Sequence, residues 1–144
     1  MQRIMNYISV PKISYETAAR AVALAMEIGP QHGIRPVVAV ADPSMTIVAY
    51  GVADGATPHS AETSVRKAKT SASTGKPSNA IPEALGTILP LGTGGTLTPI
   101  PGGLPIAFDG THVGGLGVAG GPPAVDREVA LEVLKQLGAD GIEG

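Results

Sequence analysis

The sequence has neither cysteine nor tryptophan, and its 144 residues include only one Phe and three Tyr. Without cysteine the chain can form no disulfide, no thiolate metal site and no thiol nucleophile. Hydrophobic residues make up 43% of the chain but aromatic ones only 3%. We therefore expect a core built from Ala, Val, Leu and Ile.

Long apolar runs and an excess of positive charge are also missing. No stretch approaches the roughly 20 apolar residues that a membrane-spanning helix needs. The N-terminus lacks the basic start and apolar run of a signal peptide. The formal net charge is −2, which argues against a nucleic-acid surface. We expect a cytoplasmic protein that binds neither membranes nor nucleic acids.

One β-hairpin organises the second half of the chain. Asp109-Gly110 suits a two-residue type I′ turn, because both central residues of that turn need positive φ. This turn joins predicted strands over 104–108 and 111–118. Three glycines in the returning strand imply that a helix or a ligand comes close to its backbone. The predicted register pairs Phe108 with Thr111, Ile106 with Val113 and Leu104 with Gly115.

The remaining segments surround this hairpin in a single domain over residues 1–144. Periodicity, caps and stop signals predict the other elements: helices over 14–33, 60–74 and 124–137, and strands over 37–41 and 46–52. Residues 1–12 are expected to form a flexible arm or an edge strand, and residues 86–98 a long loop or one further strand. The fold class is α+β, with an antiparallel sheet flanked by helices.

The helix over 60–74 carries the clearest functional signal. One face holds hydroxyls around a single ammonium: Ser60, Thr63, Ser64, Lys67, Thr70, Ser71 and Thr74. The opposite face, with Ala61, Val65, Ala68 and Ala72, is expected to pack on the sheet. This stripe predicts a site for a small anionic ligand, centred on Lys67. A solvated face or a subunit contact is the alternative interpretation.

His59 precedes this helix and lies close in sequence to Asp54 and Glu62. A histidine beside acids predicts a general base or a metal ligand, against the alternative of an ordinary loop residue. The three histidines do not show metal-ligand spacing, so we expect no metal site.

Residues 115–120 match G-x-G-x-x-G, but no later strand supplies the acid that a dinucleotide site requires. We reject that interpretation. The Gly120-Gly121 amides at the start of a helix still predict donors for a carboxylate or a phosphate.

The sequence resembles the GlcG/HbpS family, also called DUF336, which includes the C-terminal domain of PduO-type proteins. The similarity runs from about residue 13 to 137 and rests on these residues: Asp54-Gly55-Ala56, Ser60, Lys67-Ala68, Thr70, Pro77, 101–106, 113–121 and Asp126. It implies a compact, profilin-like α+β domain that forms homo-oligomers. Some relatives bind haem, and others resemble catabolic proteins of ring-cleavage pathways. Met45 departs from the family pattern, since a turn glycine is common there.

Three hypotheses follow. In the first, the protein is a cofactor-independent enzyme acting on a small unsaturated oxo, hydroxy or amino carboxylate from aromatic ring cleavage, by hydrolysis, deamination, hydration or tautomerisation. His59, Glu62 and Lys67 are its predicted catalytic residues, and its predicted substrate-binding residues are Ser60, Thr63, Thr70, Gly102, Gly103, Gly120 and Gly121. In the second, the protein is a non-catalytic haem-binding or haem-sensing protein, with His59 or His112 as axial ligand and Lys67 paired with a propionate. In the third, the hydroxyl stripe is a contact in a structural oligomer.

Overall fold

A computed structural model describes residues 4–142. Its helices and strands are, in chain order, α1 (Tyr15–Gln31), β1 (Val37–Ala41), β2 (Ile47–Val52), α2 (Ser60–Thr74), the 3-10 turns Ser78–Ala80 and Glu83–Leu85, α3 (Ile88–Gly92), β3 (Gly103–Phe108), β4 (Thr111–Ala119) and α4 (Pro123–Leu137). The sequence predicted the helices α1, α2 and α4 and all four strands to within two residues at nearly every end. The short helix α3 was not predicted.

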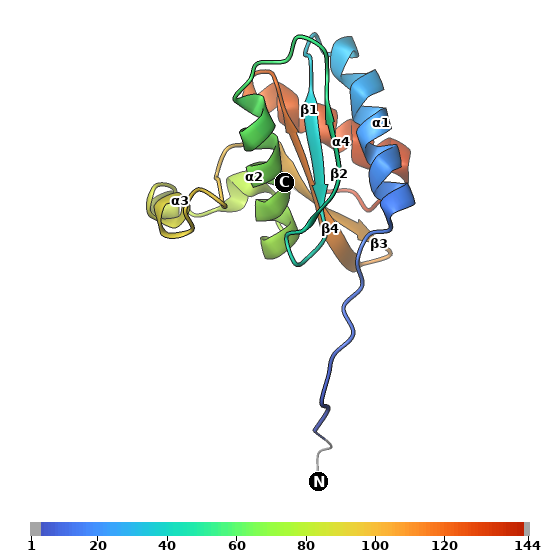
Figure 1. The fold of residues 1–144 in the computed structure, drawn as a ribbon, viewed down its shortest axis with the longest axis vertical. Coiled ribbons are helices and arrows are strands. Elements are labelled where there is room, and N and C mark those ends of the chain that lie inside the picture. Colours follow the sequence, from blue (N-terminus) through green and yellow to red (C-terminus); the bar gives the residue numbers. More distant parts are fainter. Residues whose placement is uncertain (1–3, 143–144) are drawn as a thin grey trace.

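The four strands form one antiparallel sheet in the order β2-β1-β4-β3. Helices α1 and α4 contact each other and cover one face of this sheet, while α2 covers the other face (Figure 1). The predicted α+β class is confirmed.

The two faces of the sheet differ in the size of their side chains. The face toward α1 and α4 carries the main aliphatic core: Val38, Val40, Leu104, Ile106, Leu116 and Val118. On the other face Ala39 and Ala41 of β1 lie beside Gly117 and Gly115 of β4. A Cβ on Gly115 or Gly117 would meet the backbone of α2. The glycines therefore serve the close approach of a helix, one of the two alternatives that the sequence left open.

The hairpin follows the predicted register only at its tip. Phe108 pairs with Thr111, and Asp109 and Gly110 both have positive φ, as a type I′ turn requires. The register then shifts at a β-bulge, so that Ile106 pairs with Gly114 and Leu104 with Leu116. The predicted pairs Ile106–Val113 and Leu104–Gly115 are wrong, because Val113 is the extra residue of the bulge. The Val113 carbonyl instead accepts a hydrogen bond from the Ile13 amide (2.9 Å).

The polar stripe of α2 faces the sheet rather than lying opposite the packed face. Ser60, Ser64, Lys67 and Ser71 are buried together with Ala68 and Ala72, whereas Ala61 and Val65 are only half-buried. The predicted packed face of α2 was therefore wrong: the helix is rotated about its axis by part of a turn from the predicted orientation. Hydroxyls can be buried here because several of them donate back to carbonyls of their own helix, as Ser64 does to Ala61 (3.0 Å).

The segment before β3 forms a lobe around α3, which protrudes beside α2 (Figure 1). Two buried hydroxyls attach this segment to the domain. Thr70 accepts a hydrogen bond from the Thr98 amide (2.9 Å), and Ser78 donates to the Ile100 carbonyl (2.6 Å). The further strand considered over 88–98 is absent, and α3 occupies that region.

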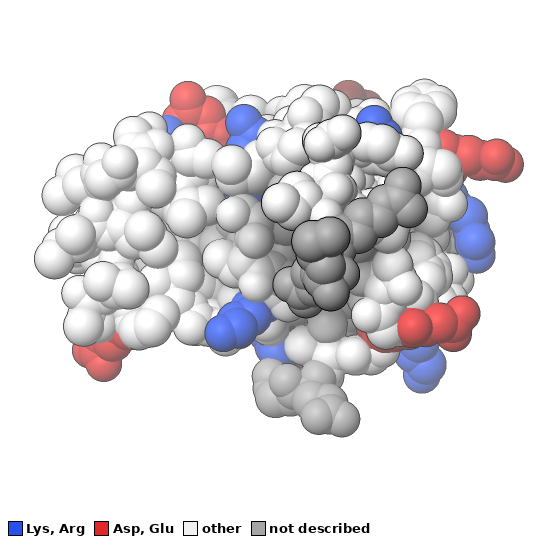
Figure 2. Space-filling model, turned by 90° about the horizontal axis from the view of Figure 1, so that it is seen from below, with Lys and Arg blue, Asp and Glu red and all other residues white. Residues whose placement is uncertain are grey.

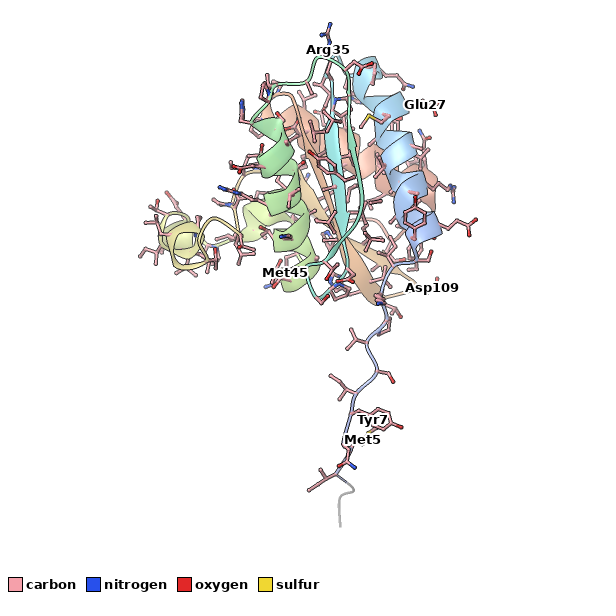
Figure 3. The ribbon with its side chains drawn as sticks, in the orientation of Figure 1. Met5, Tyr7, Glu27, Arg35, Met45 and Asp109 are labelled. Atoms are coloured by element: carbon pink, nitrogen blue, oxygen red, sulfur yellow. The ribbon has the colours of Figure 1, made fainter. Side chains whose placement is uncertain are left out.

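Met45 lies in the β1–β2 turn at the lower end of the domain, labelled in Figure 3. Its φ is +66°, a conformation that glycine adopts far more easily than other residues. This geometry explains why the family pattern favours glycine at the position. The buried carboxylate of Asp42 holds the turn by accepting hydrogen bonds from the Ser44 hydroxyl (2.6 Å) and the Ser44 amide (2.9 Å).

Candidate functional site

A hollow of about 250 Å³ lies where the first turns of α2 meet the junction between β4 and α4. The close packing of α2 on β4 brings these segments together, although they are far apart in sequence. The hollow is lined by ten residues: His59, Ser60, Thr63, Lys67, Ile100, Ala119, Gly120, Gly121, Pro123 and Asp126. Six of them are residues that the sequence analysis assigned to a site. We call this hollow the His59 cavity.

A buried ion pair forms one wall of the His59 cavity. The Lys67 ammonium donates to the Asp126 carboxylate and to the Val118 carbonyl, both at 2.9 Å. Both charged side chains are only 2% exposed. The second carboxylate oxygen of Asp126 accepts a hydrogen bond from the Gly121 amide (2.9 Å). The pair therefore joins α2, β4 and the start of α4.

Burial perturbs both members of this pair. It lowers the pKa of Lys67 below its ordinary value, although the hydrogen bond and the charge of Asp126 oppose the shift. Burial likewise raises the pKa of Asp126, against the opposing effects of Lys67 and the Gly121 amide. Desolvation disfavours the charged form of each group. Transfer of the proton from the amine to the carboxyl is consequently easier here than between the same groups in water.

The ion pair changes the expected role of Lys67. The sequence analysis assigned its ammonium to a ligand carboxylate, or to a haem propionate. In the structure the Asp126 carboxylate already occupies that position, so this wall of the cavity carries no net charge. An incoming anion would also meet the negative charge of Asp126.

His59 is the N-cap residue of α2 and lies at the exposed mouth of the cavity. Its ring makes no hydrogen bond or ion pair with any described residue. The other two imidazoles are engaged. His32 contacts Glu132 (3.0 Å), and the Nε2–H of His112 donates to the Ala72 carbonyl (2.7 Å). Of the three histidines, His59 is therefore the best placed to bind an incoming group.

Hydroxyls and glycines complete the cavity. The Ser60 hydroxyl lies 2.6 Å from that of Thr57, and the Thr63 hydroxyl donates to the His59 carbonyl (3.0 Å). Both oxygens can still accept a hydrogen bond from a ligand. Gly120 has φ +121°, and the Gly121 amide is committed to Asp126.

Four predicted site residues lie outside the cavity. Glu62 is exposed and pairs with Arg66 (3.3 Å), and it borders a separate hollow of about 320 Å³. Thr70 anchors the lobe segment instead. Gly102 and Gly103 lie beneath α2, and the Gly103 amide donates to the Ser78 hydroxyl (3.0 Å).

Sequence reasoning did not assign Asp126, Ile100, Ala119 and Pro123 to the site, although the structure places all four on its lining. Asp126 had a usable signal. A lysine that is buried among short side chains needs an acidic partner. Asp126 was available as that partner, because it was one of the residues on which the family resemblance rests.

Residues 4–142 contain no group of histidine and acidic side chains arranged to hold a metal ion. Within the same range, no helix combines the length and apolarity that crossing a bilayer requires.

Comparison with known proteins identifies one family. The model of the family described as "Haem degrading protein HbpS-like" matches residues 13–135. A search of curated proteins gives no match. Among solved structures, ORFY of Klebsiella pneumoniae superposes with a TM-score of 0.88 at 22% identity, covering 94% of this chain and 97% of ORFY.

Two further structures are similar. A double mutant of Streptomyces reticuli HbpS has a TM-score of 0.82 at 28% identity, with 96% of this chain and 95% of HbpS covered. A PduOC:haem complex has a TM-score of 0.84 at 20% identity, with 92% of this chain and 99% of PduOC covered. At that identity the likeness to PduOC, like that to ORFY, shows the fold alone.

Proposed function

Because this chain belongs to the HbpS-like family of haem-degrading proteins, we propose that it binds haem and that His59 is the axial ligand. The observation that carries the proposal is the imidazole of His59, which makes no hydrogen bond or ion pair with any of residues 4–142 and stands at the mouth of a partly apolar hollow. Support also comes from the similarity to HbpS and to a PduO-type domain that was solved with haem. The role is one of binding or sensing, the alternative that the sequence analysis kept beside an enzyme.

The residues present fit haem in part. Histidine nitrogen is a common axial ligand, and Ile100, Ala119 and Pro123 give the cavity an apolar side. Its volume of about 250 Å³ falls below the roughly 300–1,000 Å³ of drug-sized ligand pockets. The hollow alone is therefore too small to enclose a haem. A bound haem would supply an iron centre with visible absorption and redox chemistry, and His59 would hold the iron.

We expect His59→Ala to weaken hemin binding at least roughly tenfold, since even outer-shell groups of metal sites are worth about 10- to 100-fold in affinity. Hemin titrations followed at the Soret band measure the change. His112→Ala and His32→Ala are the matched controls, because their rings are engaged within the protein, and both should bind hemin as the parent does. Equal affinities for all three variants would remove His59 as the ligand.

A second candidate function is the enzyme acting on a small carboxylate. The observation that favours it is the enclosed ion pair beside hydroxyls and an available imidazole, in a hollow of small-molecule size. In that case His59 would transfer protons at the mouth, and Ser60 and Thr63 would orient the substrate. The cytoplasmic location expected from the sequence stays a prediction in either case.

We also propose that the protein self-associates, and that residues 4–12 take part. These residues have neither helix nor strand, and they extend away from the domain, with the side chains of Met5 and Tyr7 clear of it (Figures 1 and 3). Five large apolar side chains of this arm are 59–89% exposed: Ile4, Met5, Tyr7, Ile8 and Val10. Exposed apolar patches of this kind mark interaction sites. The lobe around α3 is also nearly uncharged, at the left of Figure 2.

Deletion of residues 1–12 is therefore expected to reduce the mass of the particle in solution. Size-exclusion chromatography with light scattering measures that mass. The control is Met5→Ala, which removes one apolar side chain and should have a smaller effect. If the deletion leaves the mass unchanged, residues 4–12 take no part in self-association.

A further inference from the structure

Lys67 is the largest fully buried side chain of the described protein. A lysine is rarely buried this deeply, because removing an ammonium from water is costly unless the group is paired. Asp126 provides the pairing at 2.9 Å. Here both side chains border the His59 cavity, so a small molecule in the hollow would lie next to them.

The backbone packs closely against the amine on the side away from the cavity lining. A Cβ on Gly102 would lie 2.5 Å from the Val118 carbonyl oxygen, 2.8 Å from the Lys67 nitrogen and 3.0 Å from its Cδ. Gly102 has φ +125°, so any other residue would be strained at this position as well as crowding the amine. Lys67, the one buried lysine among residues 4–142, is therefore held in place on this side by backbone.

We propose that Lys67 acts as a nucleophile and forms an imine with a small aldehyde or ketone that enters the His59 cavity. Desolvation is one of the ways in which proteins activate a lysine amine for imine formation with a carbonyl compound. The inference goes beyond haem binding. It rests on the second candidate function, for which it names the substrate class and gives Lys67 a covalent role.

The chemistry balances with the groups present. Asp126 takes one proton from the Lys67 ammonium, which leaves a neutral amine beside a neutral carboxylic acid. The amine lone pair then forms a C–N bond to the carbonyl carbon as the C–O π bond breaks, and the oxygen takes a proton from the attacking nitrogen to become a hydroxyl. The nitrogen lone pair then expels that hydroxyl, which takes the proton of Asp126 and leaves as water. The product is a protonated imine beside the Asp126 carboxylate. No oxidant, reductant or metal is required, and Asp126 never remains as an unpaired buried charge.

Reductive trapping tests the proposal on the unmodified protein. Acetaldehyde and pyruvate are the probes, each with sodium borohydride as the hydride donor that fixes any imine as a stable secondary amine. Peptide mass mapping then measures the modified fraction of every lysine. Lys12, Lys69, Lys76 and Lys135 are internal controls, because all are more exposed than Lys67.

We expect at least one probe to modify Lys67 several-fold more than any other lysine at pH 7. Modification confined to the exposed lysines, with Lys67 untouched by both probes, would overturn the proposal. Lys67→Arg keeps a cation beside Asp126 but has no primary amine, so it should give no trapped adduct at position 67, while the exposed lysines are modified as in the parent. The experiment contains no hemin, and its outcome is therefore independent of the Soret titrations.

Discussion

Lys67→Ala is expected to lower the free energy of unfolding by about 3–5 kcal/mol, the usual cost of removing one partner of a buried ion pair. The substitution would leave the Asp126 carboxylate buried with the Gly121 amide as its remaining partner. The loss is a large part of the roughly 5–15 kcal/mol by which a domain is stable. Chemical denaturation measures it.

The matched control is Lys69→Ala, which truncates the same side chain on the same helix outside the pair. It should change stability by no more than about 0.5 kcal/mol. The double variant Lys67→Met/Asp126→Leu should recover most of the loss, because apolar residues of similar volume often replace a buried pair without penalty. A Lys67→Ala protein as stable as Lys69→Ala would mean that the pair is not buried in solution.

The pH dependence of the Lys67→Ala variant gives a second test. The folded state already raises the pKa of Asp126, and loss of the ammonium would raise it further. An acid with a raised pKa binds its proton more tightly in the folded state, so its stability contribution is present at low pH and is lost as pH rises through that pKa. The difference in free energy of unfolding between Lys67→Ala and the parent should therefore become smaller as pH falls from 7 toward 4.

Gly117→Ala is expected to destabilise the protein by about 1–3 kcal/mol or more, as overpacking of a tight core does. The added methyl would meet the α2 backbone at Ser64 and Ala68, with the Ala68 nitrogen at 2.5 Å. Backbone atoms cannot move aside as the end of a side chain can. Helix α2 would have to move away from the sheet, and the His59 cavity lies between these two elements.

Gly92→Ala is the control for this substitution. It adds the same methyl, but nothing lies within 4 Å of the new Cβ. Urea denaturation of both variants should give a near-neutral Gly92→Ala and a clearly weakened Gly117→Ala. Equal stabilities would contradict the close packing of α2 on β4.

Local sequence signals were sufficient for most of the fold. Asp109-Gly110, the Ser14 cap and the glycines at helix ends act within a few residues, so they fix turns and helix limits directly. The bulge at Val113 could not be predicted in this way. The bulge residue accepts a hydrogen bond from Ile13. Ile13 lies 100 positions away in the sequence and is not itself part of a strand.

The site could be predicted only in part, again because local patterns are visible in the sequence and long-range contacts are not. The spacing of α2 grouped Ser60, Thr63 and Lys67 correctly, because helical periodicity is local. The predicted orientation of α2 on the sheet was wrong. The face that α2 turns toward the sheet is set by the glycines of β4, and the sequence of α2 alone does not determine it. The pairing of Lys67 with Asp126 joins residues 59 positions apart, and no spacing rule predicts such a contact.

The crystal structure of the protein after soaking with hemin tests the central claim most directly. We predict that the iron is bonded to the imidazole of His59 and that the Lys67–Asp126 pair is intact. Iron bonded to His32 or His112, or hemin distant from the start of α2, would contradict it.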